Sequence, residues 1–202
     1  MKFILGKKMN MTQLFLENGE VKPVTTVLVK PMTVTQVKTK EKDGYSAVQV
    51  GFNETLEKRI NKAQKGHAKG LGNFADYREF AGSSDLKVGD KIDLSSFNEG
   101  DTVVASSISK GKGFQGVVKR HGFKGGPRSH GQKHSEREPG SISGGARGGG
   151  RVPKGMRMAG RMGGTLITVK NLKIVQIDKT NGMLYISGAI PGRRGTVVEI
   201  KG

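Results

Sequence analysis

Short runs of β-branched and other apolar residues fill the first half and the last fifth of the chain, and Asn-Gly or Asp-Gly pairs separate several of them. Such pairs favour two-residue hairpin loops, because both central positions of a type I′ turn need a positive φ. The pattern therefore predicts hairpins that turn at Asn18-Gly19, Asp43-Gly44 and Asn181-Gly182. The strands expected along the chain span 11–16, 21–29, 34–38, 45–52, 102–108, 165–177, 183–190 and 196–200.

Many short antiparallel strands joined by hairpins are typical of a small barrel or sandwich rather than of a parallel α/β sheet. We therefore expect a mainly β fold whose body is a small antiparallel β-barrel.

One helix is predicted from residue 54 to about residue 65, because its apolar positions lie on one side. Asn53 is its expected N-cap, and Gly66 is expected to end it. The helix would belong to a small α/β insertion over 53–85. Three aromatic residues are expected to anchor this insertion to the barrel: Phe74, Tyr77 and Phe80.

Residues 110–161 depart from this pattern. They hold 13 Lys and Arg against two acids, a net charge of +11, together with 15 of the 32 glycines and only ten apolar residues. Ordering a backbone costs about 1–2 kcal/mol per residue, whereas each buried apolar side chain returns only about 1.5–3 kcal/mol. The segment therefore cannot fold alone, and we expect a glycine-rich basic extension over 110–162 that a partner orders. The barrel body would then comprise 1–52, 86–109 and 163–202.

The whole chain of 202 residues has a formal net charge of +18 and a pI near 10.2. Such a basic balance indicates a polyanionic partner. The chain has no cysteine, which excludes disulfides, zinc–thiolate sites and cysteine nucleophiles. No apolar run has the length of a signal peptide core or a membrane span. We therefore expect a cytoplasmic protein that contacts neither a membrane nor a small-molecule substrate.

The stretch Gly111–Gly116 matches G-x-G-x-x-G after a predicted strand, and Glu136 follows its last glycine by twenty residues. A dinucleotide site needs a helix immediately after this motif. Residues 117–127 begin with two valines and continue into glycines and a proline, so we expect no helix there and no cofactor. The preferred interpretation is a close backbone approach to RNA, with Lys112 and Lys119 on phosphates.

His121, His130 and His134 could be imagined as a metal site together with Glu136. The spacing of the last two histidines would suit one face of a helix, but Gly131 and the surrounding glycine, serine and lysine argue against a helix. We expect no metal, and histidines that stack on bases or donate to phosphates. The sequence also has no P-loop triplet, no G-x-S-x-G elbow and no convincing carboxylate pair for acid–base catalysis, so no catalytic residue is predicted.

Cations interleaved with glycine continue from 147 to 161. Glycine keeps this part of the chain thin, and arginine offers forked donors to phosphate. Two further basic pairs, Lys7-Lys8 and Arg193-Arg194, are expected to share the same RNA face. The candidate RNA-binding residues are Lys7, Lys8, Lys110, Lys112, Lys119, Arg120, His121, Lys124, Arg128, His130, His134, Arg137, Arg147, Arg151, Lys154, Arg157, Arg161, Arg193 and Arg194.

Seven strings of residues, spread in order over nearly the whole chain, carry a family resemblance. They are Ile4–Phe15, Val34–Lys40, Lys42–Gln49, Ser109–Phe123, Ser129–Gly131, Pro139–Ile142 and Met158–Gly163. In this order they resemble the bacterial form of large-subunit ribosomal protein three. The central string, SKGKGFQGVVKRHGF, is the most specific of them.

The resemblance implies a structural ribosomal protein that is not an enzyme and has a translation-protein-like barrel. It would bind the large-subunit ribosomal RNA near its 3′ end and nucleate subunit assembly, with its extension running toward the peptidyl transferase region. Its expected neighbours include large-subunit proteins fourteen and nineteen. The family's methylated glutamine is expected to be absent, since no glutamine occurs between Lys133 and Ile174.

Two other functions stay open on the sequence alone. One is an RNA-modifying or nucleotide-dependent enzyme that uses the glycine motif, which binding of a nicotinamide or flavin dinucleotide would reveal. The other is a free-standing RNA-binding translation factor with a similar barrel, which a moderate salt wash would release from large subunits.

Overall fold

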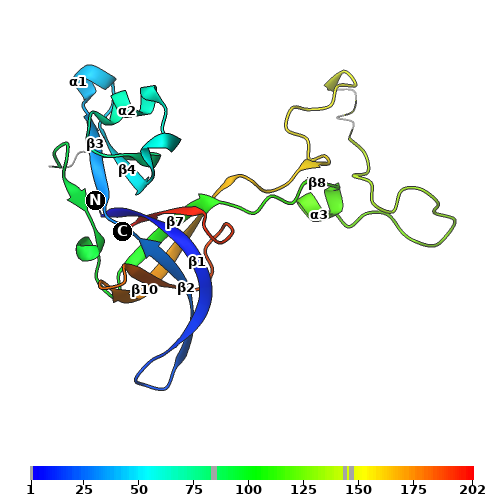
Figure 1. The fold of residues 1–202 in the computed structure, drawn as a ribbon. Helices are drawn as coiled ribbons and strands as arrows, with labels where there is room; N and C mark the ends of the chain where they lie inside the picture. The colour runs from blue at the N-terminus through cyan, green and yellow to red at the C-terminus, as the bar shows by residue number, and fades with distance from the viewer. Residues whose placement is uncertain (1, 83–85, 143–144, 146–147) are drawn as a thin grey trace. The chain divides into compact units, whose positions relative to one another are not determined.

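The computed structural model describes residues 2–82, 86–142, 145 and 148–202. Six strands of the described chain close an antiparallel barrel in the order β1-β12-β7-β10-β11-β2 (Figure 1). Their bounds are Phe3–Phe15 for β1, Val21–Val29 for β2, Thr102–Ile108 for β7, Leu166–Asp178 for β10, Met183–Ser187 for β11 and Val197–Lys201 for β12. The predicted mainly β fold with a small antiparallel barrel is confirmed.

The first and last strands of the barrel pair with each other. Phe3 of β1 lies opposite Lys201 of β12, and Gly202 N–H donates to the Lys2 carbonyl at 3.0 Å. On its other side β1 pairs with β2, where Gly6 lies opposite Val29. A Cβ on this glycine would lie 2.3 Å from a methyl carbon of Val27, so the barrel wall closes here only without a side chain.

The three predicted hairpins all reverse the chain, but none uses a type I′ turn. Only the glycines Gly19, Gly44 and Gly182 have positive φ, at 80°, 82° and 65°. At the first turn Gly19 N–H donates to the Leu16 carbonyl, which makes a three-residue loop ending in a left-handed glycine. At the second, the one-turn helix α1, Lys40–Asp43, ends on Gly44. The expectation of positive φ at both residues of each pair is therefore wrong.

A second sheet of four strands has the order β5-β4-β3-β6. Its bounds are Phe74–Ala81 for β5, Ala47–Glu54 for β4, Met32–Lys38 for β3 and Lys91–Ile92 for β6. The strands predicted over 34–38 and 45–52 therefore lie in this sheet, and their expected place in the barrel is wrong. The physical reason is that β4 is buried on both faces from Ala47 to Phe52, whereas an antiparallel barrel strand commonly keeps one face in solvent.

The predicted helix over 54–65 is misplaced. Strand β4 continues to Glu54, which pairs with Phe74, and a 3₁₀ turn, η1, follows at Glu57–Arg59. The helix α2 then spans Lys62–Ala68, because the Asn61 side chain accepts from Gln64 N–H while the Gln64 side chain accepts from Asn61 N–H. This reciprocal capping box displaces the start of the helix, and Gly66 lies inside it.

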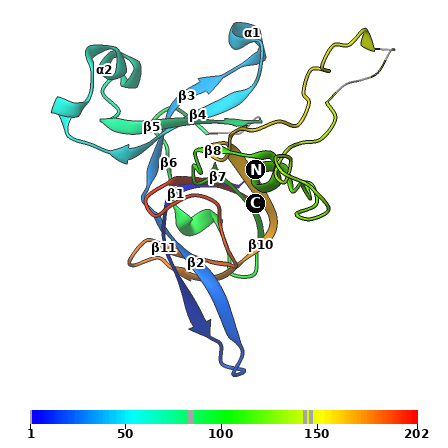
Figure 2. The same cartoon turned by 90° about the vertical axis from the view of Figure 1, so that its right-hand side faces the viewer.

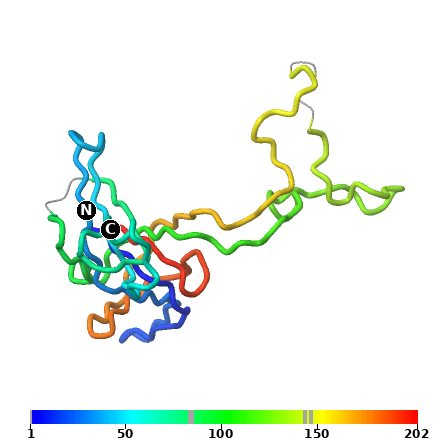
Figure 3. Tube along the Cα trace, turned by 45° about the horizontal axis from the view of Figure 1, so that its top comes forward, coloured from blue at the N-terminus to red at the C-terminus, as the bar shows by residue number. Residues whose placement is uncertain are grey.

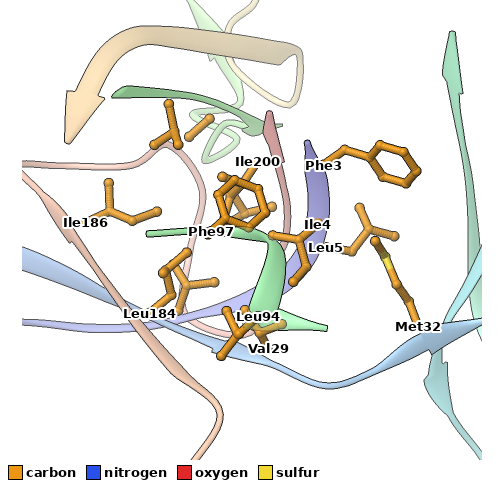
Figure 4. Close-up of a cluster of buried hydrophobic side chains, with 14 of the residues drawn as sticks. Phe3, Ile4, Leu5, Val29, Met32, Leu94, Phe97, Leu184, Ile186 and Ile200 are labelled. Atoms are coloured by element: carbon orange, nitrogen blue, oxygen red, sulfur yellow. The ribbon is translucent and has the colours of Figure 1, made fainter. Parts of the chain in front are cut away.

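The barrel and the four-stranded sheet share one apolar core. The 3₁₀ turn η2, Leu94–Ser96, lies among the barrel strands in Figure 2. Figure 4 shows its Leu94 and the following Phe97 beside side chains of the barrel strands. The side chains labelled there are Phe3, Ile4, Leu5, Val29, Met32, Leu94, Phe97, Leu184, Ile186 and Ile200, and all are buried. Phe74 and Phe80, two of the predicted anchors, are also buried, and Tyr77 is half-buried.

Residues 109–165 form a separate compact unit. Figure 3 shows its outgoing and returning segments side by side. The two-residue strands β8, Phe114–Gln115, and β9, Gly160–Arg161, join these segments, and the short helix α3 spans Val117–His121. The expectation of no helix after Gly116 is therefore wrong. A single turn forms because Arg120 N–H reaches the Gly116 carbonyl, Val117 is buried, and Gly122, with a φ of 73°, ends it.

Candidate nucleic-acid interface

The two segments of the 109–165 unit approach each other more closely than side chains would permit. Ser109 N–H donates to the Thr165 carbonyl at 2.9 Å, and Lys112 N–H donates to the Met162 carbonyl at the same distance. A Cβ on Gly163 would lie 2.1 Å from the Lys110 carbonyl oxygen. Glycine therefore makes this part of the chain a thin two-stranded stem.

The helix α3 holds the returning segment. Arg120 Nη1 donates to the Met158 carbonyl at 2.8 Å, and His121 Nε2 lies 3.1 Å from the same oxygen. Gly160 permits this, since a Cβ there would lie 2.5 Å from the Arg120 guanidinium. Both predicted RNA-binding residues therefore have an internal contact that shapes the unit.

A loop beyond α3 is closed by two glycines. Gly126 N–H donates to the Glu136 carbonyl at 3.0 Å, and a Cβ on Gly125 would lie 2.0 Å from that oxygen. Arg128 Nε lies 3.7 Å from Glu136 Oε2, and both side chains are largely exposed. This is the one ion pair among the described residues of 109–165.

Most predicted cations of this unit are exposed. In the described part of the chain they make no side-chain hydrogen bond or ion pair, so their charges face solvent. These residues are Lys110, Lys112, Lys119, Lys124, Arg137, Arg151, Lys154, Arg157 and Arg161. The exposed side chains of His130 and His134 have no such partner either. Arg147 lies outside the described residues.

The basic pairs of the barrel divide into two kinds. Lys7 Nζ donates to Asn53 Oδ1 at 2.6 Å, and Lys8 Nζ donates to the carbonyl of Gly192 at 3.0 Å and to that of Ile190. Both lysines are half-buried, and Lys8 fixes the turn that carries the other pair. Arg193 and Arg194 on that turn are exposed. Of these four predicted residues, the two arginines thus have their charge free for a ligand.

Several acids of the body form ion pairs with body cations. Lys38 Nζ lies 2.8 Å from Glu79 Oε1, and this hydrogen bond holds the pKa of the Glu79 carboxyl below its ordinary value of 4.5. Lys65 lies 2.7 Å from Glu57 and lowers the pKa of that carboxyl in the same way. Arg78 lies 3.1 Å from Glu199. These three cations of the body are thus paired with acids, whereas a single ion pair, Arg128 with Glu136, occurs among the described residues of 109–165.

Phe114 is the exposed residue that sequence reasoning missed. Its side chain is 77% exposed on β8, opposite Arg161 on β9. The available signal was an aromatic residue placed among Lys112, Gly113 and Gly116, which offer no apolar side chain large enough to cover it.

The described residues hold no group of three or more His or acidic side chains arranged to bind a metal ion. The glycine motif at 111–116 is followed by α3, but this helix is only five residues long and the preceding two-residue strand pairs antiparallel with β9. A dinucleotide site needs a longer helix in a parallel βαβ unit. Within the described chain, no helix has the length and apolar character needed to cross a membrane.

Comparison with known proteins places these features in a family. The model of the family described as ribosomal protein L3 matches residues 61–184. Three relatives named large ribosomal subunit protein uL3 are similar over nearly their whole length. The one from Finegoldia magna is 47% identical over 100% of this chain and 97% of its own, that from Nocardia farcinica is 47% identical over 98% and 91%, and that from Streptococcus pyogenes serotype M1 is 46% identical over 99% and 96%.

These matches cover the barrel, the four-stranded sheet and the basic unit together. The resemblance predicted from the seven strings is thereby confirmed, and the chain belongs to the ribosomal protein L3 family.

Proposed function

We propose that this protein binds the large-subunit ribosomal RNA directly, near its 3′ end, and nucleates assembly of the subunit there. As a member of the L3 family it is a structural constituent of the large ribosomal subunit in the cytoplasm, and it is not an enzyme. The glycine-rich extension over 110–162 would reach along the RNA toward the peptidyl transferase region, with the barrel and the 53–85 insertion as its platform.

The observation that carries this proposal is the exposed, unpaired charge of the 109–165 unit. Nine of the predicted lysines and arginines in the described part of 109–165 have no internal partner, whereas ion pairs neutralise Glu57, Glu79 and Glu199 in the body. A narrow stem with free cations on its surface can enter a crevice between RNA helices and meet phosphates on more than one side. Arg193 and Arg194 would add phosphate contacts from the barrel.

Neighbouring large-subunit proteins are the second class of partner that we propose, with proteins fourteen and nineteen expected from the family. Exposed apolar side chains at the end of the β1–β2 hairpin, Met11, Phe15 and Val21, support a protein contact. Glu17 and Glu20 flank them, and these acids would repel RNA.

The salt dependence of RNA binding tests the main proposal. With six to ten phosphate contacts, affinity for a fragment containing the 3′-terminal part of the large-subunit RNA should fall by about 10³–10⁵ between 50 and 200 mM salt. A triple variant, Arg151→Gln, Lys154→Gln and Arg157→Gln, should reduce the logarithmic salt slope by about one per lost contact.

Matched substitutions in the body provide the control. Lys40→Gln, Lys42→Gln and Lys62→Gln remove the same charge from exposed positions of α1 and α2 and should leave the slope within error. A flat salt dependence of the unmodified protein would refute direct RNA binding. Release of the protein from large subunits by a moderate salt wash would favour a free-standing factor instead.

A further inference from the structure

We infer that Phe114 is a stacking platform for an unpaired RNA base, with Lys112 and Arg161 on the phosphates beside it. This inference rests on the proposed function and names one contact within it. The ligand class is a nucleotide whose base is splayed out of its helix.

The backbone that carries Phe114 is held on both sides. Lys112 N–H donates to the Met162 carbonyl, and Met162 N–H donates to the Gly113 carbonyl, both at 2.9 Å. Phe114 itself pairs with Arg161 in the β8–β9 ladder. An aromatic residue whose backbone is held in this way can present the face of its ring without a large loss of side-chain entropy on binding, since only two χ angles need to be ordered.

The surroundings of the ring are small, polar and cationic. Gly113 and Gly116 carry no side chain, Gln115 turns its amide back to the Lys112 carbonyl, and Val117 is buried. Among the described residues of 109–165, the other large apolar side chains that are exposed are Val152 and Met156. A protein partner would need a contiguous apolar patch, which a lone ring does not provide.

Exposed cations flank the ring instead. Lys112 precedes it by two residues, Arg161 faces it across the ladder, and neither side chain has an internal hydrogen bond or ion pair in the described chain. A π face between two free cations matches a nucleotide, which offers one aromatic ring and a phosphate on each side.

Phe15 provides a matched comparison inside the same molecule. Its ring is 74% exposed, nearly as much as that of Phe114, but it lies on the β1–β2 hairpin between Leu14 and Leu16, with Glu17 close by. Phe15 is therefore a similarly exposed ring with apolar and acidic neighbours, and these do not suit a nucleotide.

The experiment compares two RNA probes on the full-length protein. One is a twelve-nucleotide oligoadenylate with a single 2-aminopurine, and the other is the same oligomer with abasic sites in place of its central bases. Stacking on an aromatic ring tolerates any base, so an arbitrary sequence serves. Affinity is read by fluorescence anisotropy, and stacking is read by quenching of 2-aminopurine.

Phe114→Leu should weaken binding of the oligoadenylate by about 5- to 150-fold and abolish the quenching, while the abasic oligomer binds both proteins equally. Phe114→Tyr should restore affinity and quenching, and Phe15→Leu should change neither. Equal affinity of Phe114→Leu and the unmodified protein for oligoadenylate would overturn the inference. A second result would also overturn the inference: Phe114→Leu quenches 2-aminopurine as the unmodified protein does but is retained less well in reconstituted large subunits. That result would assign the ring to a protein contact.

The result also separates this inference from the proposed function. If the unmodified protein binds both oligomers with a steep salt dependence and Phe114→Leu behaves identically, the stacking site alone is refuted. If the unmodified protein binds neither oligomer nor the ribosomal RNA fragment, RNA binding itself is refuted and the stacking site falls with it.

Discussion

Phe3 of β1 stacks on Phe80 of β5, with ring centroids 4.1 Å apart and planes inclined by 21°. The pair joins the first barrel strand to the edge strand of the four-stranded sheet. Lys201 of the last barrel strand places its ammonium 5.3 Å from the centroid of the Phe80 ring. One aromatic side chain of the second sheet thus contacts both strands that close the barrel.

We predict that Phe80→Ala destabilises the body by about 3–5 kcal/mol, because the buried ring leaves a cavity between two sheets. All three tyrosines, Tyr45, Tyr77 and Tyr185, lie outside the 109–165 unit, so urea unfolding followed by tyrosine fluorescence reports on the body alone. Phe15→Ala is the matched control and should change stability by less than about 0.5 kcal/mol, because that ring is exposed. Equal effects of the two substitutions would contradict a shared core.

A second prediction concerns two glycines with opposite surroundings. A Cβ on Gly51 of β4 would lie 2.4 Å from the Phe74 ring, whereas a Cβ on Gly66 of α2 would meet nothing within 4 Å. Gly51→Ala should therefore destabilise by about 1–3 kcal/mol through overpacking. Gly66→Ala should stabilise by about 0.5–1 kcal/mol, because alanine favours a helix interior. The sign of the change in urea midpoint distinguishes the two cases.

The pH dependence of stability should include a contribution from Glu79. Its carboxylate accepts hydrogen bonds from Lys38, Tyr45 and Gln49, and its pKa in the folded protein is lower than the ordinary 4.5. The folded state therefore binds fewer protons than the unfolded state in this range. The stabilisation is present above the ordinary pKa and is lost as the pH falls through the lowered pKa of the folded protein.

Glu79→Gln should accordingly lower stability at pH 7 and reduce the loss of stability on acidification, measured by urea unfolding at several pH values. Glu41→Gln is the control, because the exposed Glu41 side chain has no hydrogen bond or ion pair in the described chain. It should leave the slope of stability against pH unchanged. An unaltered slope for Glu79→Gln would show that the carboxylate network is not maintained in solution.

Amide hydrogen exchange in the free protein should show two classes of amides, one slow and one fast. Strands β10 and β11 pair from Ile174 opposite Ile186 to Asp178 opposite Met183, and their amides should exchange slowly. The described amides of 122–157 make only scattered hydrogen bonds, in turns and across one loop, and should exchange rapidly without RNA. Adding the ribosomal RNA fragment should slow exchange in the second class. Strong protection of 122–157 in the free protein would contradict the expectation that a partner orders the extension.

The local sequence pattern predicts that a strand exists better than it predicts the sheet to which the strand belongs. Runs of β-branched and other apolar residues predict strands β7, β10, β11 and β12 within a few residues of their bounds. In β7, β11 and β12 buried positions alternate with less buried ones. The place of β4 in a second sheet depends on its pairing with β5, which puts Val48 opposite Phe80 and Glu54 opposite Phe74, twenty or more residues away. A pattern within one strand does not contain that information.

Composition and charge predict which cations of the candidate interface are exposed. They do not predict the internal hydrogen bonds of four candidate residues or the short helix α3. The exposed cations of 109–165 follow from composition, since ten apolar residues cannot bury them. Lys7, Lys8 and Arg120 are predicted from charge, and His121 from its capacity to stack or donate. Their side chains also bond to Asn53 and to backbone carbonyls of distant residues. The helix α3 was missed because two valines disfavour helix in isolation, whereas here Val117 is buried.

The pairing of β1 with β12 has a consequence for the order of events during synthesis. The first strand leaves the ribosome long before Val197–Lys201, so its outer edge stays unpaired while about 180 further residues are made. The cationic 109–165 segment emerges within that interval, ahead of the strand that completes the barrel. A nascent chain can therefore present its cations to RNA before its body is closed, and closure of the barrel is a late, long-range step of folding.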